Sequence, residues 1–149
     1  MEYKIAWFTE GGWQGKVPRN NPNMRNDMAW MHTFDVVHYP ITHLPNIQEK
    51  YDIGIITIPK ENIGHYMQIN VVNELKRVCK KGTMQEGPHW YFQDYTMEQQ
   101  IWFYNVLAEL DFIWCHNEID KKYFEGLTRK KCYVNPTLML EDQIKPHIV

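Results

Sequence analysis

The amino-acid sequence predicts an α/β fold, a Rossmann-like three-layer α/β/α sandwich with a mainly parallel sheet of about six strands. Six short apolar segments alternate mostly with helical patterns, which is typical of a parallel sheet covered by helices on both faces. Residues 51–59 form a nearly continuous apolar run, as expected of a strand buried on both faces. The 149 residues suffice for one such domain, spanning 1–149.

The composition is that of a soluble globular domain, with 44% hydrophobic and 23% charged residues. A net charge of −2 without a basic run argues against nucleic acid or an anionic membrane as a partner. The three cysteines show no paired spacing, which predicts reduced thiols and a cytoplasmic location. No apolar run approaches the roughly 18 residues of a membrane span. Six tryptophans suggest a surface that stacks on something flat, although aromatic residues more often belong to a core.

The first half of the chain predicts three strands and one helix. An apolar run at residues 3–8 is the first strand, and Asn21 followed by Pro22 is a suitable start for a helix. Methionines at helical spacing then predict the buried stripe of that helix. The second strand covers residues 34–39, and the third is the apolar run at residues 51–59. The methionines of the stripe are Met24, Met28 and Met31.

The second half predicts three more strands and three helices. A helix is expected from about residue 65 to residue 80, with basic residues in its last turn and Gly82 as its stop. A short strand follows, and Thr96 then begins a capping box for the next helix. The remaining elements are strands at residues 111–115 and 131–135, and between them a helix capped by Asn117 and ended by Gly126.

Four loops are expected at one edge of this sheet, because the carboxyl ends of parallel strands lie together. Ligands of open parallel sheets bind at that edge. The loops are residues 10–16, 59–64, 86–94 and 116–117.

The first of these loops is rich in glycine. Gly11, Gly12 and Gly15 let backbone amides approach a ligand closely, which favours a phosphate-binding loop. Their spacing matches neither GxGxxG nor a P-loop, so a flexible turn is the alternative. Glu10 and Trp13 in the same loop are further candidate substrate-binding residues.

The third loop combines ionisable and aromatic residues around a Gly-Pro turn. His89 at the end of a strand can act as a base or hydrogen-bond a sugar or phosphate, and the alternative is a histidine that only packs on Trp90. Glu86 either orients His89 and binds hydroxyls, or accepts hydrogen bonds from loop amides. We take His89 as the candidate catalytic residue, and Glu86 and Trp90 as candidate substrate-binding residues.

His116 follows the fifth predicted strand, where contact with a ligand and simple helix capping are both reasonable. With Glu118 it forms the HxE motif of zinc deaminases, but no PCxxC motif follows and Cys132 stands alone, which excludes that site. Cys115 is expected to be a buried thiol, because neighbouring side chains on a strand point to opposite faces. No metal site is predicted.

Taken together, several of these segments resemble the N-terminal half of the GT-B glycosyltransferases. They are the Gly-Gly-Trp-x-Gly loop at residues 11–15, the Glu-Gly-Pro-His turn at residues 86–89 and the segment at residues 108–118. Residues 123–138 are similar to the part of that family that precedes the interdomain linker. The resemblance covers nearly the whole chain and is based on pattern and order.

The resemblance implies the acceptor-side half of two Rossmann-like domains that face each other across a cleft. In such enzymes the C-terminal domain binds a nucleotide-sugar donor. By resemblance, His89 faces the transferred sugar, the loop at residues 11–15 lies near the donor phosphates and the acceptor, and His116 lines the same cleft. The family implies no bound metal or other cofactor.

A second domain of that family would begin where this sequence ends, at Val149. The expectation is therefore a domain that is inactive alone and meets its nucleotide-sugar donor through a missing C-terminal domain, with a separate C-terminal subunit or a homodimer as its protein partner. The acceptor is unknown. The alternative function is a non-catalytic flavodoxin-like module that binds a partner protein or a phosphate-bearing ligand, since doubly wound sheets serve many functions.

Overall fold

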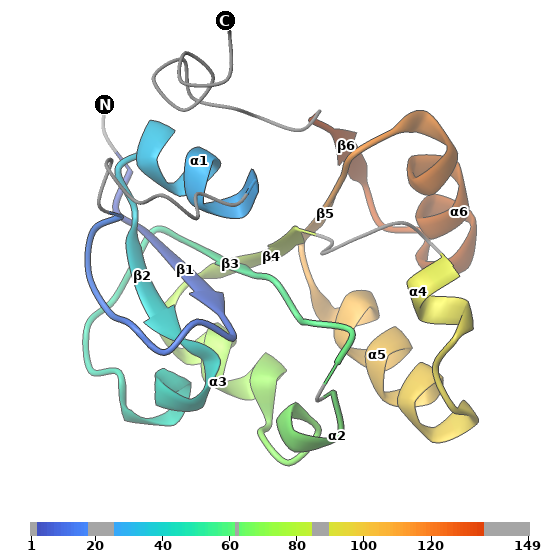
Figure 1. Ribbon diagram of the computed structural model, residues 1–149, viewed down its shortest axis with the longest axis horizontal. Helices are drawn as coiled ribbons and strands as arrows, with labels where there is room; N and C mark the ends of the chain where they lie inside the picture. The colour runs from blue at the N-terminus through green and yellow to red at the C-terminus, as the bar shows by residue number, and fades with distance from the viewer. Residues whose placement is uncertain (1–2, 18–25, 62, 85–89, 136–149) are drawn as a thin grey trace, which may run out of the picture.

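The computed structural model describes residues 3–17, 26–61, 63–84 and 90–135 (Figure 1). Within them, six parallel strands form one sheet in the order β2-β1-β3-β4-β5-β6. The predicted α/β class with a parallel sheet of about six strands is thereby confirmed. The strands are β1 (Ile5–Thr9), β2 (Val37–Pro40), β3 (Ile53–Ile56), β4 (Lys80–Met84), β5 (Phe112–Cys115) and β6 (Cys132–Val134).

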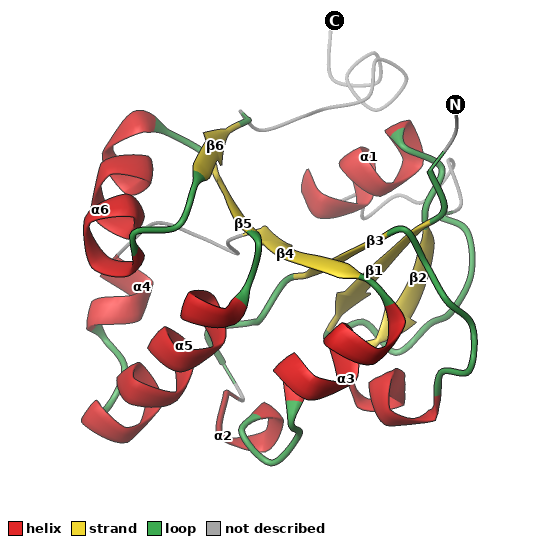
Figure 2. Cartoon of the chain, turned by 180° about the vertical axis from the view of Figure 1, so that it is seen from behind, coloured by secondary structure: helices red, strands yellow, loops and turns green. Residues whose placement is uncertain are grey.

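Helices cover both faces of this sheet (Figures 1 and 2). Successive strand residues point to opposite faces, so Trp7 lies in one core cluster while Ala6 and Phe8 lie in the other. The larger cluster is covered by η1, α3, α5 and α6, and the smaller one by α1. The helices are α1 (Asn26–Thr33), the 3-10 helix η1 (Ile41–Asn46), α2 (Ile63–Tyr66), α3 (Val71–Val78), α4 (Trp90–Gln93), α5 (Met97–Glu109) and α6 (Glu118–Thr128).

Several local predictions are confirmed. Thr96 and Gln99 form the expected capping box at the start of α5, and the Asn117 side chain accepts from the Asp120 amide at the start of α6. The two described methionines of the predicted stripe, on α1, are buried. The remaining methionine, Met24, and the predicted cap at Asn21 and Pro22 lie outside the described residues.

The predicted helix from residue 65 to residue 80 is wrong. Two helices, α2 and α3, replace it, and Asn70 caps the second by accepting from the Asn73 amide. Gly82 is not a helix stop but a residue of β4, as is Lys80. A Cβ at Gly82 would lie 2.1 Å from the Phe112 ring, so the glycine lets that ring pack flat on the neighbouring strand.

The predicted end of α6 at Gly126 is also wrong. The helix continues to Thr128, and Arg129 adopts the left-handed conformation (φ 59°) that closes it. The Thr128 hydroxyl donates to the Phe124 carbonyl inside the last turn. The buried contacts of Phe124 and Thr128 therefore outweigh the weak helix propensity of a single glycine.

Most of the tryptophans described here belong to the core rather than to a stacking surface. Trp7 and Trp114 are buried with their ring centroids 5.6 Å apart, and Trp30 of α1 meets Trp114 edge-on at 5.0 Å. Trp13 and Trp102 are only half-buried. Across the part of the chain that the structure describes, no helix has the length and apolar character needed to cross a membrane.

Candidate functional site

The candidate site lies where the strand order changes direction, at the carboxyl ends of β1 and β3. The chain passes from β1 to β2 on one side and later returns to β3 on the other. In open α/β sheets a crevice forms outside such a switch point, and ligands bind there. The Thr57 amide donates to the Phe8 carbonyl at 2.9 Å, so the loops that leave these two strands begin side by side.

The loop after β1 is held by His38, a fully buried residue of β2. His38 Nδ1 lies 2.8 Å from the Trp13 carbonyl oxygen, which can only accept, so Nδ1 donates this bond. In the neutral ring Nε2 then accepts from the Thr9 hydroxyl at 2.6 Å. The Thr9 oxygen in turn accepts from the Gly11 amide at 3.0 Å. One imidazole thus fixes both ends of the glycine turn.

Burial keeps this imidazole uncharged. It lowers the pKa of His38 to about 4, against the smaller opposing effect of the hydrogen bond to the Trp13 carbonyl. The Trp13 ring stacks on His38 with 3.8 Å between centroids and shields it from solvent. Because the ring is neutral near pH 7, it serves as a structural hydrogen-bonding group rather than as a source of positive charge for a ligand.

The glycines of this loop have different roles. Gly15 has φ +117°, which an L side chain rarely adopts, and it exchanges two backbone hydrogen bonds with His38 (2.9 and 2.8 Å). A Cβ at Gly11 would lie 2.9 Å from Trp13 Nε1. At Gly12 nothing lies within 4 Å of an added Cβ, and the residue is exposed. The backbone at Gly12 is therefore open to a ligand.

The loop after β3 meets α4 and Asp94, the residue that follows α4, beside this turn. Lys60 Nζ lies 2.8 Å from Asp94 Oδ2 and 4.8 Å from the centre of the Tyr91 ring. Glu10, which is exposed, lies close enough to Tyr66 of α2 that its charge adds to the effect of burial in raising the phenol pKa. Segments that follow β1, β3 and β4 thus share one surface.

His116 lies at the same edge but farther along the sheet. It is half-buried between β5 and α6, and strands β3 and β4 separate it from β1. At about 4.8 Å per strand this corresponds to roughly 14 Å from the glycine turn. Trp90 is the first residue of α4, and the predicted residues Glu86 and His89 lie outside the described part of the chain.

A polar groove of about 370 Å³ lies on the outer side of the glycine turn. Gln14 of the turn forms one wall, and residues in and after η1 form the other. Amide and carboxylate side chains predominate, which provides hydrogen-bond donors and acceptors but little net charge. The lining residues are Gln14, Tyr39, His43, Asn46, Ile47, Gln48 and Glu49.

The described residues hold no metal-ligand cluster, and the two buried cysteines, Cys115 and Cys132, are not activated. The described residues contain no group of three or more His, Cys, Asp or Glu side chains placed to hold a metal ion. Cys115 is buried, as expected, and burial raises the pKa of its thiol well above the usual range. Burial also raises the pKa of Cys132 to about 11, so neither thiol is an activated nucleophile.

Comparison of the chain with protein families, curated proteins and solved structures gave no significant match. The function is therefore argued from the site. Two contributors had little sequence signal. The first is His38, for which the available clue was an ionisable residue inside an apolar strand segment. The second is the contact between Lys60 and Asp94, which lie 34 positions apart in the sequence, so no local pattern predicts it.

Proposed function

We propose that this domain forms the acceptor side of a site that transfers a glycosyl group from a nucleotide sugar. The observation that carries the proposal is a pre-organised glycine turn at the β1/β3 switch point with a hydroxyl-matching groove beside it. The open backbone at Gly12 suits phosphate oxygens, and the groove suits a polyhydroxylated acceptor. In the GT-B glycosyltransferases that the sequence resembles, a glycine loop near the donor phosphates and an acceptor-binding surface likewise occur in one domain.

In this proposal each residue contacts the part of the ligand that lies nearest to it. The turn at residues 11–15 approaches the donor phosphates, and His116 contacts the far end of a ligand that extends along the edge. His89, which follows β4 in the sequence, keeps the role that the resemblance gives it, facing the transferred sugar. The nucleotide itself is bound mainly by a second domain, so the domain alone has weak affinity for the donor and no turnover.

The test is a titration of the ¹⁵N-labelled chain with UDP-glucose and GDP-mannose, followed by amide chemical shifts. We expect shifts at the amides of Gly11 and Gly12 and at Lys60. Gly12→Ala should abolish them, because its Cβ projects into open space where the ligand must approach. Gly126→Ala is the matched control, since a Cβ there also meets nothing within 4 Å but lies on α6.

The outcomes separate the proposal from its alternative. The strand order β2-β1-β3-β4-β5 is that of flavodoxin, which binds FMN at the same switch point, and this favours a phosphate-bearing ligand as the second candidate. Shifts at the turn with FMN or inorganic phosphate but with neither nucleotide sugar would support that alternative. Equal binding by both glycine variants, or donor hydrolysis by the chain alone, would contradict the proposed function.

A further inference from the structure

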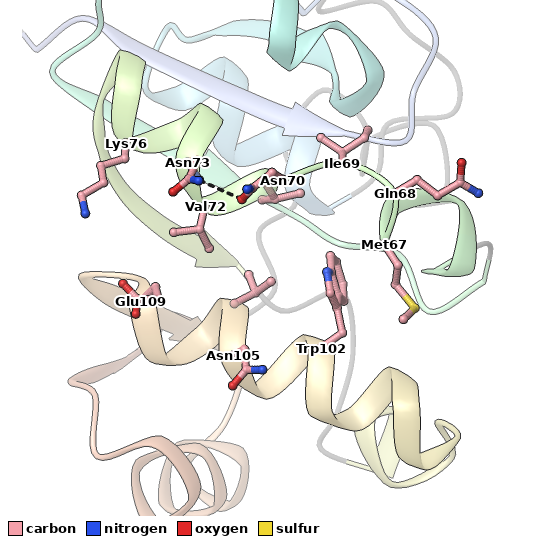
Figure 3. A pocket seen from close by; sticks show the side chains of 12 residues that line it. Met67, Gln68, Ile69, Asn70, Val72, Asn73, Lys76, Trp102, Asn105 and Glu109 are labelled. Atoms are coloured by element: carbon pink, nitrogen blue, oxygen red, sulfur yellow. Dashed lines mark hydrogen bonds between the residues drawn. The ribbon is translucent and has the colours of Figure 1, made fainter.

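A second groove, of about 550 Å³, lies between α3 and α5 (Figure 3). The segment that joins α2 to α3 borders one end of it, and the groove continues between the two helices. It shares no lining residue with the glycine turn or with the polar groove. Its volume is in the range of small-ligand sites, roughly 300–1,000 Å³.

One end of this groove is apolar and built around Trp102. The indole is half-buried, packs edge-on against Phe103 with 6.4 Å between centroids, and rises from α5 toward Ile69 (Figure 3). Met67, Ile69 and Val72 are also partly buried against the core cluster. An indole held in this way offers a flat apolar surface and has little side-chain entropy left to lose on binding.

Apart from Val71 and Val106, the rest of the lining is polar and nearly neutral. Asn70 and Asn73 come from the start of α3, and Asn105 follows Trp102 by three residues, so that both lie on one face of α5. Side-chain amides both donate and accept, as hydroxyl groups do. Lys76 and Glu109 stand on opposite helices farther along and balance each other in charge (Figure 3).

We propose that this groove binds a neutral saccharide, with a sugar face on Trp102 and hydroxyls on the asparagine amides. A flat apolar surface bordered by neutral donors and acceptors matches a sugar ring, which has an apolar C–H face and a rim of hydroxyls. A single lysine opposed by a carboxylate does not suit an anion. A partner helix would need an apolar stripe along its whole length, whereas polar side chains of both helices interrupt the apolar ones here.

The test follows the Trp102 indole N–H and the Asn105 side-chain amide in ¹⁵N spectra while maltose, cellobiose or chitobiose is added. We expect both signals to shift with at least one disaccharide. Trp102→Leu keeps apolar packing but removes the flat surface, and should weaken binding about ten-fold. Asn105→Leu changes an exposed residue, so it tests the polar wall without threatening the fold. Tyr104→Leu, which removes a partly exposed aromatic ring of α5 that does not line the groove, should bind normally.

The proposal is overturned if no disaccharide shifts these signals at millimolar concentrations, or if uridine shifts them and the sugars do not. Equal loss of binding in the Trp102 and Tyr104 variants would also overturn it. The inference is independent of the glycosyl-transfer proposal. Gly12→Ala should leave disaccharide binding in this groove intact while abolishing the nucleotide-sugar shifts, and the reverse pattern is expected of Asn105→Leu.

Discussion

The two loops that meet at the switch point are held in different ways. The turn after β1 depends on a buried imidazole that bonds to Thr9 and Trp13. The loop after β3 starts from buried residues, Thr57 and Ile58, but farther out it is held by Lys60, which contacts Asp94 where the two side chains are 36% and 56% exposed. Water can replace the partners of the exposed Lys60 and Asp94 side chains, but it cannot replace those of the buried His38 ring. A buried group that loses its partner costs about 1–3 kcal/mol, whereas exposed ion pairs contribute little.

In the proposed site, the turn after β1 is the fixed part and the outer part of the loop after β3 is the adaptable part. A surface fixed by buried hydrogen bonds loses little entropy when it binds, so the turn at residues 11–15 is suited to recognise a fixed group such as phosphate. The outer part of the loop after β3 contacts α4 and Asp94 through Lys60, at the surface. We expect it to adjust to different ligands at small energetic cost.

The largest expected effect concerns pH. His38 has a lowered pKa in the folded protein, about 4 against 6.5 in the unfolded chain, so between these values the unfolded chain binds more protons. The stability that results is fully present above pH 6.5 and is lost as the pH falls toward 4. Between pH 7 and pH 4.5 we expect the free energy of unfolding to fall by about 2 kcal/mol through this residue, measured by urea unfolding.

His38→Gln is the control for this prediction, because glutamine retains a donor and an acceptor but does not titrate. Its unfolding free energy should be lower at pH 7 and depend less on pH over the same interval. The wild-type imidazole can also be followed directly by NMR. A ring signal of His38 that titrates near pH 6.5 in the folded protein would show that burial does not hold it neutral.

An intermediate effect is expected from the backbone of the same turn. Gly15→Ala forces a side chain into φ +117° and should cost about 1.5 kcal/mol of unfolding free energy. Gly12→Ala, three residues earlier, meets no atom within 4 Å and should change stability by less than about 1 kcal/mol. Urea unfolding of both variants tests the assignment. Equal losses would mean that the turn is strained throughout rather than at Gly15.

The sequence predicted the fold well because its signals are local and repeated. The alternation of apolar runs with capped helices determines a parallel sheet, and Thr96 and Asn117 begin their helices as expected. The errors occurred where tertiary contacts outweigh local propensity. Lys80 and Gly82 look like a helix end in isolation, but pairing with β3 and β5 places them in a strand.

The candidate site was predictable only in outline. The position of the glycine loop after the first strand followed from the order of elements, since parallel strands place their carboxyl ends together. The role of His38 could not be derived, because it depends on which strand lies beside β1 and on the direction of one side chain. The role of Trp102 could not be derived either. Helical spacing predicts that Trp102 and Asn105 share one face of α5, but it does not predict that α3 lies opposite that face.

The smallest expected effect tests the second loop. Lys60→Met removes the contact with Asp94 but retains an apolar stem over the Tyr91 ring, so the urea midpoint should not change measurably. Amide hydrogen exchange in residues 91–95 should nevertheless become faster, because one of the described links between the loop after β3 and the segment at α4 is gone. Asp94→Asn should behave in the same way. A loss of stability as large as that of Gly15→Ala would mean that this loop, too, is a fixed part of the site, and the contrast between the two loops would no longer hold.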